Sequence, residues 1–243
     1  FPVLLVRVLV IGAATAAAVA GHRLGTHPLG KTAAMTVAVW NPLVIERLLQ
    51  GQWSLAVAAW LIPLVALGGR AGPVAQWVAS LTPTGAISAA CFVRSRAGLV
   101  VAALSCALWV VAGALATGGG TATPESAAAF APRAEQYVGT LGALMGLGGI
   151  WNGAAVPASR EVGFALFGIP LFVLLGLGWR AVPRRWLALA AAGFAIALAS
   201  WAGLTNPVVT HVPGGGLLRD AQKWLVLAIP VSYKHLRAHE TSL

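Results

Sequence analysis

The densest group of polar side chains follows a glycine turn, in the stretch Pro213–Trp224 (PGGGLLRDAQKW). Arg219 and Lys223 stand four residues apart, so a helix would place them on one face, where two cations suit a phosphate or diphosphate. Asp220 would point roughly 100° away on that helix, as a general base or a contact for a sugar hydroxyl. Gln222 belongs to the same group. The alternative interpretation is an interfacial cap that keeps the next helix from sliding.

A second group of chemically useful residues interrupts an apolar segment at Trp40–Trp53 (WNPLVIERLLQGQW). The proline after Asn41 cannot continue a helix normally, so we expect the helix to break there. Glu46 and Arg47 would then lie on a short interfacial helix. Charges near membrane depth are costly and indicate function, so the functional interpretation expects Glu46 or Arg47 to face a polar cavity at the outer leaflet. The alternative is a local ion pair that caps a helical hairpin.

The longest predicted loop contains a glycine-rich apolar stretch, Gly139–Gly153 (GTLGALMGLGGIWNG). This stretch is too rich in glycine for an ordinary helix. Gly142 and Gly146 favour an interfacial helix that docks backbone to backbone. The functional alternative is a lid or acceptor-binding loop that ends in Trp151 and Asn152.

One motif match has a simpler explanation. Gly25–Thr32 (GTHPLGKT) satisfies the phosphate-loop pattern GxxxxGK[ST]. That loop needs a strand before it and an aspartate elsewhere to help hold magnesium. Here it joins two apolar runs, and the only aspartate, Asp220, is predicted on the opposite side of the membrane. We therefore interpret it as a cytoplasmic turn anchored by Lys31 and expect no nucleotide. His211 has no second histidine nearby, so no metal site is predicted.

The composition determines which elements can position these residues. The chain has 243 residues, of which 58% are apolar and 9% charged, with a mean hydropathy of +0.83. Soluble domains carry about 25% charged residues, so these values predict a polytopic membrane protein. The net charge of +10 comes from basic residues scattered singly between apolar runs. That pattern favours anchoring at lipid headgroups and excludes nucleic acid as the expected partner.

The apolar runs predict an all-α transmembrane bundle of six to seven spans, each needing roughly 17–25 residues. A seventh span begins near Trp224, and Gly72–Phe92 is interpreted as a re-entrant or amphipathic pair of half-helices. The first six predicted spans are Phe1–Ala20, Thr32–Ile45, Trp53–Leu67, Ala97–Ala116, Gly163–Trp179 and Trp186–Leu204.

Charge also predicts the orientation. One face collects eight basic residues and is predicted to be cytoplasmic: Arg23, Lys31, Arg70, Arg94, Arg96, Arg180, Arg184 and Arg185. The other, external face holds five basic residues and every acidic residue before position 232. These acidic residues are Glu46, Glu125, Glu135, Glu161 and Asp220. Any carboxylate-dependent chemistry is therefore expected outside.

Both ends of the chain have the character of cut ends. The sequence starts at Phe1, and the last apolar run stops after eight residues. Ser232–Leu243 (SYKHLRAHETSL) is basic and polar, and it resembles translated sequencing-adapter read-through. We therefore expect a single integral-membrane domain over residues 1–231, truncated at both ends, followed by an artefactual tail.

Three stretches together carry a resemblance to known proteins: Trp40–Trp53, Phe130–Asn152 (FAPRAEQYVGTLGALMGLGGIWN) and Leu217–Trp224 (LLRDAQKW). They resemble actinobacterial multi-pass membrane proteins similar to the GT-C glycosyltransferases. The resemblance implies transfer of a sugar from a polyprenyl-phosphate donor to a glycan acceptor, at the external face of the bacterial plasma membrane, during cell-envelope polysaccharide assembly. It implies no nucleotide and leaves open a divalent metal ion. The GT-C pattern also has a carboxylate pair in the first external loop, and no stretch of this chain matches it.

The leading hypothesis is therefore a membrane sugar transferase in which Arg219 and Lys223 bind the donor phosphate while Asp220 and Glu46 act near the acceptor. The remaining predicted substrate-binding residues are Gln222, Arg47, Asn41, Trp151 and Asn152. A transporter or flippase of lipid-linked glycans is the second hypothesis, and it predicts repeated broken helices. A non-catalytic scaffold is the third, and it predicts that the charged external residues can be replaced without loss of transfer.

Overall fold

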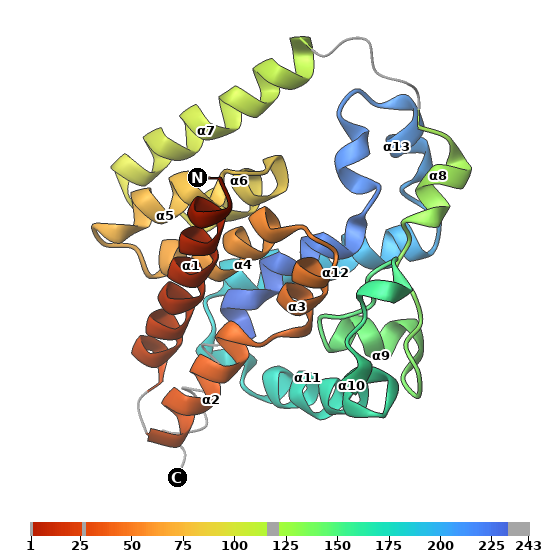
Figure 1. Cartoon of the computed structure of the whole chain (residues 1–243), viewed down its shortest axis with the longest axis horizontal. Helices are drawn as coiled ribbons and strands as arrows, with labels where there is room; N and C mark the ends of the chain where they lie inside the picture. Colours follow the sequence, from red (N-terminus) through yellow and green to blue (C-terminus); the bar gives the residue numbers. More distant parts are fainter. Residues whose placement is uncertain (1, 26–27, 116–121, 233–243) are drawn as a thin grey trace.

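The computed structural model describes residues 2–25, 28–115 and 122–232, and among these it is all-helical, as predicted (Figure 1). The α-helices are α1 Pro2–Leu24, α2 Pro28–Val39, α3 Pro42–Leu49, α4 Trp53–Leu67, α5 Ala71–Ala79, α6 Pro83–Ala90, α7 Arg96–Leu115, α8 Pro124–Ala129, α9 Gly139–Met145, α10 Ala158–Glu161, α11 Gly168–Leu177, α12 Arg184–Trp201 and α13 Asn206–His211. The 3₁₀ helices are η1 Gly153–Ala155, η2 Phe164–Phe167, η3 Trp179–Ala181, η4 Gly215–Leu218 and η5 Ala221–Ala228.

Two helices, α1 and α7, are long and apolar enough to cross a membrane. Both leave most of their side chains exposed, including Leu4 on α1 and Leu104 on α7. The bundle of six to seven spans is not confirmed. The predicted span over residues 163–179 divides into η2 and α11, and the one over residues 32–45 breaks between α2 and α3.

Helix α4 forms the centre of the molecule and packs against α1, α3, α5 and α6. Nearly all of its side chains are buried, many of them alanines, which let neighbouring backbones approach closely. The indole of Trp60 donates to the carbonyl oxygen of Val39 at 3.1 Å, which ties α4 to the end of α2. This buried helix is the platform from which α3 extends towards the polar residues.

Two predicted breaks are confirmed, and both use the same local chemistry. Helix α3 begins at Pro42, where the Asn41 side chain accepts from the Val44 N–H at 3.1 Å. Helix α6 begins at Pro83, and Thr82 caps it by accepting from the Gly85 N–H. Proline suits the first helical position because its missing N–H would be unpaired there in any case. The helices α5 and α6 are the expected pair of short helices.

The glycine-rich stretch and the end of the chain complete the core. Gly146, the residue that caps α9, makes the predicted close backbone approach: a Cβ added at Gly168 would lie 2.6 Å from the Gly146 Cα. For Gly142 the prediction is wrong, because a Cβ added there would meet the side chain of Val138, just before α9, at 2.6 Å. The predicted seventh span differs from expectation, because η5 is a buried 3₁₀ helix packed against α12. Residues 233–243 of the predicted tail, and Thr26 and His27 of the phosphate-loop match, lie outside the described residues.

Candidate functional site

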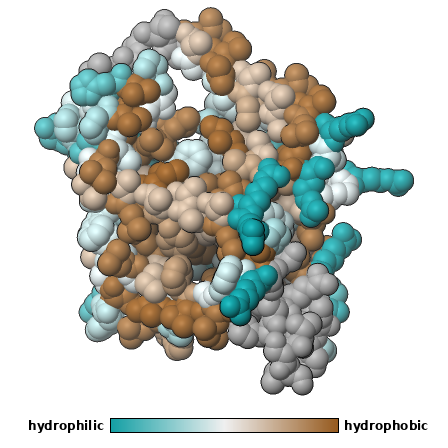
Figure 2. Space-filling model, turned by 180° about the vertical axis from the view of Figure 1, so that it is seen from behind, coloured by the Kyte–Doolittle hydropathy of each residue, from teal (hydrophilic) through white to brown (hydrophobic). Residues whose placement is uncertain are grey.

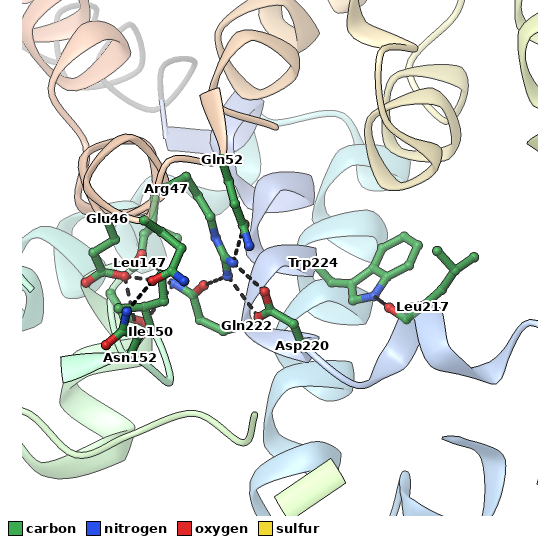
Figure 3. A network of polar contacts seen from close by, with 12 residues as sticks. Glu46, Arg47, Gln52, Leu147, Ile150, Asn152, Leu217, Asp220, Gln222 and Trp224 are labelled. Carbon is green, nitrogen blue, oxygen red and sulfur yellow. Dashed lines mark hydrogen bonds and ion pairs between the residues drawn. The ribbon is translucent and has the colours of Figure 1, made fainter. Parts of the chain in front are cut away.

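Three segments far apart in the sequence meet in one buried group of charged and amide side chains (Figure 3). Helix α3 supplies two of them, the segment from the loop before α9 to α10 supplies two, and the residues at the start of η5 supply two. We call this group the polar cluster; its members are Glu46, Arg47, Glu135, Arg160, Asp220 and Gln222, all buried.

Arg47 is the hub of one half of the polar cluster. Its guanidinium binds Asp220 through both terminal nitrogens, with Nη2 at 3.0 Å from Oδ1, and it also donates to the side-chain oxygen of Gln222. Gln52 accepts from Nη1 at 2.8 Å. Arg47 is only 1% exposed, so this bidentate pairing is what makes burial of the charge tolerable.

Gln222 connects this ion pair to the rest of the cluster. Its amide nitrogen donates to Glu46 Oε2 at 3.2 Å and to the carbonyl oxygen of Gly148 at 3.2 Å. The backbone N–H of Ile150 donates to the same Glu46 oxygen at 3.2 Å (Figure 3). The glycine-rich stretch is thus held against α3 and η5 by polar contacts.

Arg160 lies between two carboxylates in the other half of the cluster. Its Nε donates to Glu135 Oε2 at 2.5 Å and lies 3.9 Å from Glu46 Oε1. The Gly149 N–H donates to the second Glu135 oxygen at 2.7 Å, from a backbone with φ +87 that favours glycine. Gly148 leaves space for the charged atoms: an added Cβ would lie 2.5 Å from Arg160 Nη2 and 2.9 Å from Glu46 Oε1.

Burial shifts the pKa of Glu46 in the cluster and of Lys223 beside it. Desolvation raises the pKa of Glu46 from 4.5 to about 8; the Glu135 carboxylate adds to the rise, while Arg160, Arg47 and the Ile150 N–H oppose it. Desolvation also lowers the pKa of Lys223 below its ordinary value, against the attraction of Asp220. Glu46 is fully buried, and its Oε1 has no hydrogen-bond partner.

A pocket of about 200 Å³ adjoins the polar cluster. Two members of the cluster, Glu135 and Arg160, line its wall, and so does Ile150, whose N–H contacts Glu46. The exposed guanidinium of Arg133 lies over Gly153, where a Cβ would approach Nη1 to 2.6 Å. The full lining is Arg133, Ala134, Glu135, Gln136, Ile150, Gly153, Val156, Arg160 and Glu161.

Aromatic and amide contacts fix the loop beside this pocket. Exposed Arg219 stacks on the Phe130 ring, with its guanidinium carbon 4.3 Å from the ring centroid. Phe130 in turn packs against Trp151, with ring centroids 4.4 Å apart. Asn152 donates from its side chain to Gln50 at 2.6 Å. Asn152 therefore ties the loop to the end of α3, while Phe130, packed on Trp151, contacts Arg219 just before η5.

The structure corrects several details of the sequence interpretation. Arg219 and Lys223 do not share an α-helical face, because η4 ends before Arg219 and η5 is a 3₁₀ helix. Glu46 and Arg47 form no local ion pair; Arg47 pairs with Asp220, and Arg160 is the ion-pair partner of Glu46. Both predicted catalytic carboxylates, Asp220 and Glu46, are buried in the polar cluster.

Asn41 lies outside the polar cluster. Its side chain caps α3 and donates to the carbonyl oxygens of Val37 and Ala38, so both ends are used within the fold. Glu135 and Arg160 are the site residues that sequence reasoning missed. The sequence offered one indication of Glu135, because it belongs to the acidic residues that gather on the predicted external face.

The cluster does not fit the divalent metal ion that the resemblance left open. Among the described residues, no three His, Cys, Asp or Glu side chains gather closely enough to hold an ion. The carboxylates of Glu46 and Glu135 both approach the Arg160 guanidinium.

Comparison of the chain with protein-family profiles, with curated proteins and with solved structures finds no match.

Proposed function

We propose that the chain is part of a membrane glycosyltransferase that takes its sugar from a polyprenyl-phosphate donor in bacterial cell-envelope polysaccharide assembly. One observation carries the proposal: the polar cluster joins residues from all three stretches that carry the resemblance. Arg47 on the first stretch binds Asp220 on the third, and Glu46 accepts from Ile150 on the second. Segments that jointly form one site are expected to meet in space, and these do.

The proposed roles follow from exposure. Arg219 and Arg133 are exposed and are carried by, or stacked on, the same loop around Phe130. Two arginines so placed suit a phosphate diester better than lysines, because each offers a planar fork of donors. Asp220 and Glu46 are buried, so we give them positioning roles. Asp220 binds Arg47, and Glu46 binds the backbone of the glycine-rich stretch at Ile150, a residue that lines the pocket.

The test is binding and transfer with a radiolabelled polyprenyl-phosphate sugar, using the detergent-solubilised chain. Replacement of Arg133 and Arg219 by glutamine is expected to raise the KM for the donor at least about tenfold, because the phosphate contacts form before the transition state. Arg70→Gln/Arg94→Gln is the matched control, since it removes two exposed arginines elsewhere. Unchanged transfer in both double variants would support the scaffold instead.

A transporter or flippase of lipid-linked glycans is the second candidate, and one observation favours it. Helices α3 and α6 both follow a break in an apolar stretch, and each begins with a proline directly after its capping residue. Transporters build substrate sites from broken helices. Reconstituted vesicles distinguish the two functions. Movement of a lipid-linked glycan between leaflets without new glycosidic bonds would support transport and contradict the transferase.

A further inference from the structure

Exposed arginines gather on a second part of the molecule, on segments that contribute no residue to the polar cluster. They come from the α4–α5 turn, the α6–α7 turn and the start of α12. We call them the arginine patch; its members are Arg70, Arg94, Arg96, Arg184 and Arg185, all exposed.

Direct contacts bring these three segments together. A Cβ added at Gly68, in the α4–α5 turn, would lie 3.9 Å from the Arg94 Cβ. Arg185, at the start of α12, donates from Nη2 to the carbonyl oxygen of Cys91 at 2.6 Å. The α6–α7 turn therefore touches both of the other segments, and the tertiary structure concentrates charges that are spread over more than a hundred residues of sequence.

The arginine patch has no counter-charge among the described residues. Every ion pair among the described residues lies in the polar cluster and none in the patch. The two remaining described carboxylates lie elsewhere, Glu161 at the pocket and Glu125 in α8. Five like charges held together without carboxylates repel one another, so an anionic partner would relieve that repulsion.

The patch also adjoins one of the two span-length helices. Arg96 is the first residue of α7, and the exposed side chains that follow it, Leu99, Val100 and Leu104, are apolar. Figure 2 shows hydrophilic side chains projecting from one edge of the molecule beside extensive apolar surface. Positive charge at the end of an apolar helix is the arrangement expected where hydrocarbon gives way to phosphate headgroups.

We propose that the arginine patch is a docking surface for the anionic phospholipid headgroups of the bilayer that receives α7. Arginine suits this partner, because its fork of donors can bind two oxygens of one phosphate. The proposal depends on membrane association but not on glycosyl transfer, and it assigns the patch and the pocket to different ligands.

The experiment measures the melting temperature of the full chain in a non-ionic detergent during titration with phosphatidylglycerol or phosphatidylcholine. Phosphatidylglycerol is expected to raise Tm in a saturable way, since a ligand that binds only the folded state stabilises it. Phosphatidylcholine is expected to give no comparable rise, and added salt should weaken the phosphatidylglycerol effect. In Arg70→Gln/Arg94→Gln, whose side chains contribute no ion pair among the described residues, we expect the apparent Kd to rise at least about tenfold.

Arg133→Gln/Arg219→Gln removes the same number of charges beside the pocket and is expected to leave the phosphatidylglycerol response unchanged. Loss of the response in this variant, but not in Arg70→Gln/Arg94→Gln, would place the headgroup site at the pocket and overturn the proposal. An equal rise with phosphatidylcholine would identify a general lipid effect, and an equal rise with inorganic phosphate would identify a free-anion site. Either result also overturns it. A failed transfer assay with an intact phosphatidylglycerol response would reject the transferase alone.

Discussion

The polar cluster and the arginine patch each draw side chains from three separate segments and both contain arginines, yet the cluster is buried and the patch is exposed. The difference lies in the carboxylates. Arg47 and Arg160 each meet an acidic side chain and are almost fully buried, whereas the patch arginines meet none among the described residues and remain in contact with solvent. A buried charge needs a partner because its lost hydration must be replaced. In a chain with only six acidic residues, the position of the acids therefore decides which arginines the fold can cover.

The largest effect is expected from removing the acid on which Arg47 depends. Asp220→Ala leaves the Arg47 guanidinium buried without a counter-charge, which typically costs about 3–5 kcal/mol. Thermal unfolding of the solubilised chain should show this as a fall in Tm of roughly 2–4 °C for each kcal/mol.

The double variant Arg47→Met/Asp220→Leu provides the control. It removes both charges at once and keeps the site filled, so most of the lost stability should return. A double variant no more stable than Asp220→Ala would mean that packing, rather than the unpaired charge, explains the loss.

A second effect is expected from pH. The pKa of Glu46 is about 8 in the folded chain, against an ordinary value of 4.5, so the folded state favours the protonated form. The stabilising contribution of Glu46 is therefore complete below about pH 4.5 and is lost as the pH rises to about 8. Melting curves across this window should show a falling Tm, and Glu46→Gln should reduce that fall. Parallel curves for the two proteins would contradict burial of Glu46.

Gly148→Ala tests how tightly the polar cluster is packed. The added methyl group would lie 2.5 Å from both Arg160 Nη2 and Glu135 Oε1, and overpacking of this kind costs about 1–3 kcal/mol. Gly216→Ala is the matched control, because nothing lies within 4 Å of its added Cβ. Equal melting temperatures for the two variants would show that the charged atoms can move apart freely.

The smallest effect is expected at the arginine patch. Without lipid, Arg70→Gln/Arg94→Gln should change stability by less than about 0.5 kcal/mol, as is usual for exposed side chains without specific partners. A large fall in Tm under these conditions would mean that the patch holds the fold together, and the contrast with the polar cluster would disappear.

Local features of the fold were predictable from particular residues. The breaks before α3 and α6 follow from Asn41-Pro42 and Thr82-Pro83, since proline and a capping side chain act within a few residues. The close approach of another backbone to Gly146 was also predictable, from the glycine-rich stretch around it. The conformation of η5 did not follow from the sequence, which predicted a membrane span from Trp224, whereas η5 is a buried 3₁₀ helix packed against α12. Arg219 and Lys223 therefore do not share the α-helical face that their spacing predicted.

The sequence by itself determined that the chain is helical, apolar and poor in acids, and it pointed to Glu46, Arg47, Asp220 and Gln222 as residues worth explaining. Only the tertiary structure decided their partners. Arg47 pairs with Asp220 across 173 positions, and Arg160 lies between Glu46 and Glu135. Helix breaks are set by short-range sterics that a sequence displays directly, whereas ion pairs depend on which distant segments approach. That choice is made by the packing of the whole core around α4.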